Sequence, residues 1–266
     1  MFMAVDVAKE GFTAIVTLSG TTSKNAFDST SVGLISSTLN ALMDDPEVRS
    51  IVLTGTGRVF CAGADIDSFQ NAIDDDTIGD LVMELTGILH PLLARMRGDS
   101  TIIIAAINGA AAGGGLGLAL ACDARIASNE AVLVSAFFRL GLSPDGGSTW
   151  LLPRLVGAQR ARRFLFNNET WDASTALEVG AVDEVVDSNE LLSRAKYLAT
   201  EWGNWANHSR KSTKQLLDSQ SSTFFETQLE FERMLITQSS MTPEFKEGVK
   251  AFQEKRAPNF SNFSEE

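Results

Sequence analysis

Two patterns of apolar positions alternate along the first two thirds of the chain. Runs rich in β-branched residues predict strands, and apolar positions three to four residues apart predict amphipathic helices. The predicted strands are 11–19, 50–55, 101–108, 124–127 and 131–134. The predicted helices are 28–43, 77–97, 146–152, 158–166 and a short one within 171–180. Alternating strands and helices of this kind predict an α/β fold.

The last third of the chain has a different pattern. Residue Asp172 is a candidate N-cap and Gly180 a candidate C′ residue for the helix between them. From about residue 188 the pattern is helical, so we expect a core at 1–190 and a helical C-terminal region at 191–266. We interpret His208, Trp202 and Trp205 in that region as packing or oligomer contacts.

Composition indicates a single well-packed protein rather than a disulfide-rich or membrane protein. The 266 residues are 44% hydrophobic, with a mean hydropathy of +0.02, which is enough to bury a full core. No run reaches the roughly 18 apolar residues of a membrane span, and the start lacks a signal-peptide pattern, so we expect a cytoplasmic protein. The two cysteines, Cys61 and Cys122, are expected to be reduced thiols, and no metal is predicted.

Charge narrows the class of partner. The formal net charge is −12 and the pI is near 4.7, which argues against nucleic acid, because binding to phosphates needs a basic face. The acidic run Asp74-Asp75-Asp76 is expected to be solvated, since three consecutive carboxylates point in different directions. The surrounding segment, 67–80, is expected to be a mobile loop near the mouth of a site.

The segment 101–123, TIIIAAINGAAAGGGLGLALACD, carries the most specific chemical signal. An apolar strand runs through small residues into Gly113, Gly114 and Gly115 and then into a helical pattern. Glycines let ligand atoms approach the backbone, and a helix start leaves N–H groups free for a negatively charged oxygen. Dinucleotide binding and tight helix-to-strand packing produce the same pattern.

A second segment of the same kind, 51–66, ends in Cys61-Ala62-Gly63-Ala64-Asp65-Ile66. Two such turns are needed to aim two N–H donors at one oxygen, as in an oxyanion hole. Their spacing in the sequence leaves open whether they converge.

With these motifs the chain resembles the crotonase, or enoyl-CoA hydratase/isomerase, superfamily over nearly its whole length. The matching segments are Lys24-Asn25-Ala26-Phe27, 60–66, Ile107-Asn108-Gly109, Gly113-Gly114-Gly115, Pro144, 152–157 and 251–260.

The resemblance implies a spiral of ββα turns, followed by C-terminal helices that assemble into trimers or hexamers. It implies that the Ala64 and Gly114 amides hold the thioester oxygen of an acyl-CoA substrate. It places Ala26, Ala62, Asp65 and Ile66 along the coenzyme A, which enters as part of the substrate and not as a separate cofactor. Lys24, Lys255 and Arg256 are candidates for its phosphates, with solvated surface charge as the alternative.

The resemblance also points away from hydration. Hydratases of this family use two glutamates, and the matching positions here are Gly117 and Phe137. Several crotonase branches place a catalytic aspartate at the position of Asp145, in a Pro-Asp-Gly-Gly sequence that is also a good plain turn. We therefore expect an enoyl-CoA isomerase or a related ring-epoxide isomerase, with Asp145 as the base and Phe137, Phe138 and Leu142 as an apolar wall.

Two other functions stay open. In an aryl-CoA dehalogenase, Asp145 would attack the ring and His90 would activate water, although those enzymes have tryptophan at the position of Phe137. His90 could also be a packing residue on a helix. Alternatively, the chain is a non-catalytic acyl-CoA-binding homologue that has lost the glutamates.

Overall fold

The computed structural model describes residues 5–19 and 24–260. The strands are β1 (Val5–Glu10), β2 (Thr13–Leu18), β3 (Ser50–Gly55), β4 (Val59–Cys61), β5 (Ile102–Ile107), β6 (Ala110–Ala112), β7 (Ala124–Ser128), β8 (Val132–Val134), β9 (Thr170–Asp172) and β10 (Glu184–Val186). The helices are α1 (Ser29–Asp44), α2 (Ile66–Asp74), α3 (Ile78–Gly98), α4 (Gly114–Ala121), the 3₁₀ turn η1 (Phe138–Leu140), α5 (Ser148–Val156), α6 (Ala158–Phe166), α7 (Ala173–Glu178), α8 (Leu191–Gly203), α9 (Asn207–Ser219), α10 (Phe225–Ser240) and α11 (Pro243–Glu254).

The strands form two sheets, and from β3 to β8 consecutive strands alternate between them. A six-stranded sheet has the order β1-β2-β3-β5-β7-β10, parallel except for the β1–β2 hairpin. A four-stranded sheet has the order β4-β6-β8-β9, parallel except for β9. The pairs β3 and β4, β5 and β6, and β7 and β8 each place one strand in each sheet, which confirms the expected ββα spiral.

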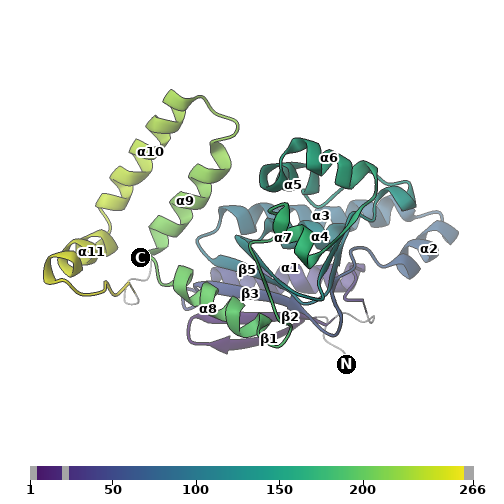
Figure 1. Cartoon of the computed structure of the whole chain (residues 1–266), viewed down its shortest axis with the longest axis horizontal. Helices are drawn as coiled ribbons and strands as arrows, with labels where there is room; N and C mark the ends of the chain where they lie inside the picture. Colours follow the sequence, from purple (N-terminus) through teal and green to yellow (C-terminus); the bar gives the residue numbers. More distant parts are fainter. Residues whose placement is uncertain (1–4, 20–23, 261–266) are drawn as a thin grey trace.

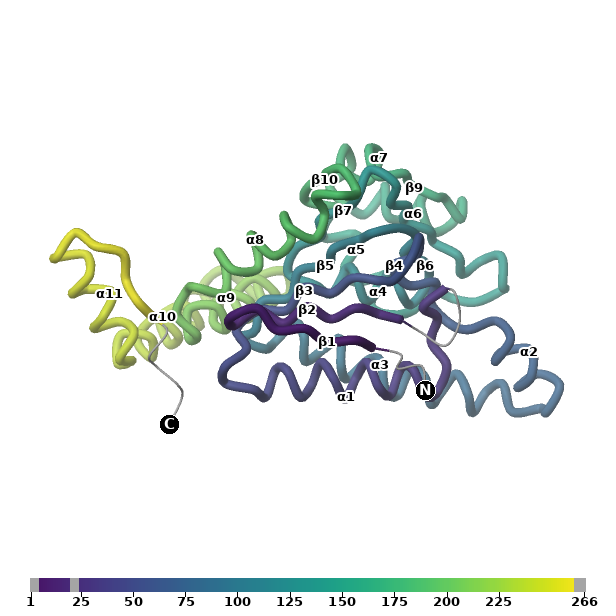
Figure 2. Tube along the Cα trace, turned by 90° about the horizontal axis from the view of Figure 1, so that it is seen from below, coloured from purple at the N-terminus to yellow at the C-terminus, as the bar shows by residue number. Residues whose placement is uncertain are grey.

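Helices cover both faces of the large sheet. Successive side chains of a strand point to opposite faces, so Ile51 and Leu53 join the main core with α1 and α3, while Val52 packs with α8. Figures 1 and 2 show α1 and α3 along one face and α8 across the other. Strands buried on both faces explain the nearly continuous apolar runs of β3 and β5.

The expected mobile loop at 67–80 is wrong, because α2 occupies most of it. The Asp65 side chain accepts a hydrogen bond from the Ser68 N–H at 2.9 Å and caps this helix. An aspartate cap three residues before an unpaired N–H stabilises a helix start, and α2 has only one buried residue, Ala72. This small buried face explains the weak helical pattern in the sequence.

The C-terminal helices divide into two groups. Helix α8 packs on the large sheet through Leu191, Ala195 and Ala199. Helix α9 is bound to the core through the buried Lys214, whose Nζ lies 3.0 Å from Asp123 Oδ2, and α10 and α11 continue from it as an arm (Figure 1). His208 joins α9 to α10, since its Nδ1 lies 2.7 Å from the Ser239 hydroxyl. Trp205 is exposed. The boundary at residue 190 stays a prediction. No helix among the described residues is long and apolar enough to cross a membrane.

Both cysteines are buried, and we expect them to be unreactive in the folded chain. Burial raises the pKa of the Cys61 and Cys122 thiols from 9.0 to about 12. Folded thiols therefore stay protonated between about pH 9 and 12 while unfolded ones ionise, so these thiols contribute stability below pH 9 that is lost as the pH rises. A thiol reagent at pH 8 should label neither cysteine until denaturant is added; fast labelling of the native protein would contradict this.

Candidate active site

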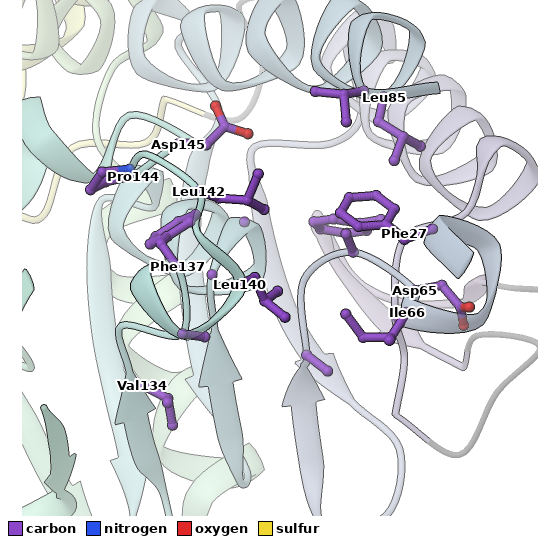
Figure 3. Close-up of a pocket in the computed structure, with 18 of the residues that line it drawn as sticks. Phe27, Asp65, Ile66, Leu85, Val134, Phe137, Leu140, Leu142, Pro144 and Asp145 are labelled. Atoms are coloured by element: carbon purple, nitrogen blue, oxygen red, sulfur yellow. The ribbon is translucent and has the colours of Figure 1, made fainter. Parts of the chain in front are cut away.

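A cavity of about 800 Å³ lies between α2 and α3 on one side and the chain from β8 to α5 on the other. Figure 3 shows Phe137, Leu142 and Asp145 on one wall, facing Phe27, Asp65 and Ile66. The other large apolar side chains that line it, apart from Pro144, are Val32, Phe69, Val82, Leu85, Leu89, Val134 and Leu140. A cavity of this size and character suits a small-molecule substrate.

The first glycine-containing turn presents the Ala64 amide to this cavity. Phe27 and Ala64 form an isolated bridge, in which the Phe27 N–H donates to Gly63 O at 2.7 Å and the Asp65 N–H donates to Phe27 O at 2.9 Å. These bonds use the Gly63 carbonyl as acceptor and the Asp65 N–H as donor, and neither uses the Ala64 N–H. Within residues 5–19 and 24–260, the Ala64 N–H has no acceptor.

The second turn presents the Gly114 amide in the same way. Helix α4 begins at Gly114 after Gly113, whose φ of 52° and ψ of −125° suit glycine. The Gly113 N–H donates to Val134 O at 3.3 Å and the Gly117 N–H donates to Gly113 O at 3.1 Å. The Gly114 N–H has no acceptor in the described part of the chain, as expected for a helix start.

The two turns touch each other. Gly63 has a φ of +82°, and a Cβ placed on it would lie 3.1 Å from the Gly114 nitrogen and 2.8 Å from Ala112 O. Both Ala64 and Gly114 line the cavity. The two turns therefore lie side by side at the cavity, which is the placement that a pair of oxyanion donors requires.

Asp145 lies on the loop between η1 and α5. Its backbone oxygen accepts hydrogen bonds from the Ser148 N–H at 3.2 Å and the Ser148 hydroxyl at 2.7 Å. Its carboxylate oxygen Oδ1 lies 2.6 Å from His90 Nε2. Asp145 lines the cavity, whereas His90 does not. The structure thus brings together Asp145, the two amides and, behind Asp145, His90.

A contact between two glycines holds this loop against α4. A Cβ placed on Gly117 would lie 2.8 Å from the Cα and the carbonyl carbon of Gly146 and would overlap its oxygen. Conversely, a Cβ on Gly146 would lie 3.4 Å from the Gly114 Cα. The loop that carries Asp145 therefore packs directly on the first turn of α4, which contains Gly114, and position 117 has no space for a side chain.

We expect Gly117→Ala to destabilise the fold by about 1–3 kcal/mol, because the new methyl group overlaps the Gly146 backbone. The matched control is Gly87→Ala in the middle of α3, where a Cβ would have no neighbour within 4 Å. That change should be neutral or stabilise by up to about 1 kcal/mol. Thermal denaturation of the two variants checks the prediction, and equal melting temperatures would contradict it.

Most of the other expected binding residues also line the cavity: Lys24, Ala26, Ala62, Asp65, Ile66 and Phe137. Two do not. The Phe138 ring packs edge-on against Phe166 at 5.4 Å, so Phe138 is not part of the apolar wall. Lys255 follows α11 in the arm and does not line the cavity of its own chain.

Arg256, the other expected phosphate ligand in the arm, is occupied by carboxylates. Its guanidinium bonds Glu247 Oε1 at 2.6 Å and Glu254 Oε2 at 2.7 Å. The Arg256 contact lowers the pKa of Glu247 to about 2. Two acidic partners leave Arg256 less suited than Lys24 to bind phosphate.

Several lining residues gave no signal in the sequence: Asp67, Thr86, Arg139, Leu140, Asn168 and Thr170. Asp67 fell in the segment expected to be a loop. Asn168 and Ala136 have φ values of 50° and 63°, and such positions in non-glycine residues cluster at functional sites. Among the described residues, no group of acidic, histidine or cysteine side chains could hold a metal ion.

Comparison with known proteins agrees with this geometry. A model of the enoyl-CoA hydratase/isomerase family matches residues 9–263. The 1,2-epoxyphenylacetyl-CoA isomerase of Escherichia coli K12 is 35% identical over 89% of this chain and 90% of its own length. The short-chain-enoyl-CoA hydratase of Clostridium acetobutylicum is 33% identical over 95% of each chain. An enoyl-CoA hydratase structure from Polaromonas sp. JS666 has a TM-score of 0.89 and 34% identity, covering 96% of this chain and 98% of that one.

The family match spans almost the whole chain, and the spiral fold and paired amides agree with it. This chain therefore belongs to the enoyl-CoA hydratase/isomerase family, also called the crotonase superfamily.

Proposed function

We propose that this protein is an acyl-CoA isomerase that moves a double bond from the 3,4 to the 2,3 position, or carries out a related ring-epoxide isomerisation. The observation that carries the proposal is the carboxylate of Asp145 in the wall of a cavity that is also lined by Ala64 and Gly114, whose N–H groups bind no acceptor among the described residues. The similarity to the Escherichia coli 1,2-epoxyphenylacetyl-CoA isomerase supports it.

Hydration is disfavoured by the two positions that carry glutamate in family hydratases. At Gly117, the Gly146 backbone fills the space that the Cβ of a side chain would need. Phe137 is a buried aromatic residue. Neither accepts a proton. The cavity wall has two other carboxylates, Asp65 and Asp67. Asp65 caps α2 and Asp67 lies in the first turn of that helix, so we take Asp145, at the position where several crotonase branches have a catalytic aspartate, as the base.

The reaction is a proton transfer in two steps. The Asp145 carboxylate removes a proton from C2 of the 3-enoyl thioester, and the electron pair moves into the thioester to form a dienolate. The Ala64 and Gly114 N–H groups stabilise the negative oxygen. The carboxylic acid then returns the proton to C4, which leaves a conjugated 2-enoyl-CoA and the original carboxylate. One base is sufficient because nothing is added.

The substrate brings its own coenzyme A, and Lys24 at the cavity is the proposed phosphate contact. Lys255, which lies in the arm, would reach a coenzyme A only in a neighbouring copy, consistent with the trimers or hexamers proposed for this chain. A cytoplasmic location fits a substrate of this kind.

The direct test is to mix the purified protein with 3-hexenoyl-CoA and follow absorbance of the conjugated thioester. We expect rapid growth of this absorbance, and no hydration of crotonyl-CoA under the same conditions. Hydration of crotonyl-CoA at a comparable rate would replace the proposal with a hydratase.

The contact between His90 and Asp145 favours a second candidate, aryl-CoA dehalogenation. There Asp145 would displace halide from the ring, and His90 would activate the water that hydrolyses the aryl ester. Chloride release from 4-chlorobenzoyl-CoA without isomerisation would select this candidate. Tight binding of acyl-CoA with neither reaction would indicate a non-catalytic homologue.

A further inference from the structure

His90 and Asp145 form a hydrogen-bonded pair in which only one member faces the substrate cavity. His90 lies on α3 and its Nε2 is 2.6 Å from Asp145 Oδ1. The exposed fractions of the two side chains are 51% and 35%. Asp145 lines the cavity and His90 does not, so the imidazole reaches the carboxylate from outside the cavity.

The proposed role of Asp145 as the base requires an ionised carboxylate, which fixes the atom of the pair that carries the proton. An ionised carboxylate is only an acceptor, so His90 Nε2 must carry the hydrogen. The bond occupies Oδ1. Within residues 5–19 and 24–260, no hydrogen bond to Oδ2 is found. One oxygen of the carboxylate is therefore bound and the other is available for a substrate proton.

The side chain of Asp145 needs such a partner because only its backbone is otherwise fixed. Ser148 binds the Asp145 carbonyl oxygen, and Gly146 packs against α4. These contacts leave the carboxylate free to rotate, since Asp χ2 is a broad torsion. In the described part of the chain, the His90 contact is the only hydrogen bond to that carboxylate.

We propose that His90 is a positioning residue for isomerisation: its Nε2–H holds Asp145 Oδ1 so that Oδ2 faces the C2 and C4 positions of the acyl chain. This inference rests on the proposed isomerase function and adds the residue that orients its base. A single base that removes a proton from one carbon and returns it to another must be oriented toward both carbons. Small misplacements of a catalytic group lower the reaction rate strongly.

The test uses three substitutions that differ in the reach of their donor. In His90→Gln the side-chain amide nitrogen can occupy the position of Nε2. In His90→Asn the side chain is shorter, so its amide nitrogen lies near the position of Nδ1 and cannot reach Asp145 Oδ1. His90→Leu has no donor. We expect kcat for 3-hexenoyl-CoA to fall about ten- to a hundred-fold in the Leu and Asn variants and to stay within about three-fold of wild type in the Gln variant. KM should stay unchanged, since His90 does not line the cavity.

A second measurement separates this inference from the isomerase proposal. Exchange of the C2 protons of butyryl-CoA in D₂O, followed by NMR, reports proton removal by Asp145 without a double-bond shift. Exchange should follow the same Gln, Asn and Leu order as kcat. If wild type neither exchanges nor isomerises, the isomerase proposal itself fails.

If wild type is active and the Leu variant is equally active, the positioning role is wrong. It is also wrong if all three variants lose activity equally, because that indicates general damage at residue 90. The tautomer gives an independent reading: the chain has two histidines, and long-range ¹H–¹⁵N NMR should show His90 protonated at Nε2, with His208 as the internal reference. An unprotonated Nε2 would overturn the proposal.

Discussion

Asp145→Ala should lower kcat for 3-hexenoyl-CoA by about 10²–10⁴-fold, the usual contribution of a positioned general base. The remaining cavity keeps both amide donors, so the variant should still bind acyl-CoA with a similar affinity. Initial rates from absorbance of the conjugated thioester give kcat, and competition with a saturated acyl-CoA gives the affinity.

Asp145→Asn is the matched control for this loss. Asparagine has the same shape and can still accept a hydrogen bond from His90, but it cannot take a proton at neutral pH. We expect it to be as inactive as the alanine variant. Because Asp145 is partly exposed, both variants should melt close to wild type. An asparagine variant that retained more than a tenth of the wild-type kcat would exclude Asp145 as the base.

The second large effect is expected from removing one donor of the oxyanion pair. Gly114→Pro deletes the N–H that faces the cavity and should lower kcat by about 10²–10³-fold, or about 2.7–4 kcal/mol of transition-state stabilisation. Proline is compatible with the first position of a helix. The preceding Gly113, with ψ at −125°, is in the mirror-image extended region open to glycine, and not in the α region that a following proline disfavours.

Gly114→Ala supplies the control, because alanine keeps the N–H. Its Cβ would lie 3.3 Å from Cε2 of the Phe27 ring, so the ring must move by only a few tenths of an ångström. We expect the alanine variant to lose much less activity than the proline variant. Equal activity of wild type and Gly114→Pro would show that the Gly114 amide does not contact the reacting oxygen.

The long elements of the core were predictable from the sequence. The strand at 50–55 and the helix at 158–166 have the predicted bounds, and the capped helix after Asp172 ends before Gly180 as expected. These segments have clear hydrophobic patterns because the helices bury one apolar stripe and the strands of the large sheet are buried on both faces. The strands of the small sheet were harder, since β4, β6 and β9 have three residues each and three residues show no period.

The site was predictable only in part for a similar reason. Ala64, Gly114 and Asp145 lie in short motifs, which a resemblance can align. The cavity position of Arg139 and Asn168 depends on how β8, η1 and β9 come together in space, and single residues carry no signal of such distant contacts. The absence of Phe138 from the wall likewise depends on Phe166, 28 positions later in the chain.

The contact of Gly146 with Gly114 and Gly117 also has a consequence for how this protein could change its substrate. The spacing between base and oxyanion donor is set by backbone against backbone, with no side chain between them. Leu140 and Leu142 also line the cavity, and they take no part in this backbone contact. Selection or design can therefore exchange those side chains to admit a different acyl group while the proton-transfer machinery keeps its dimensions.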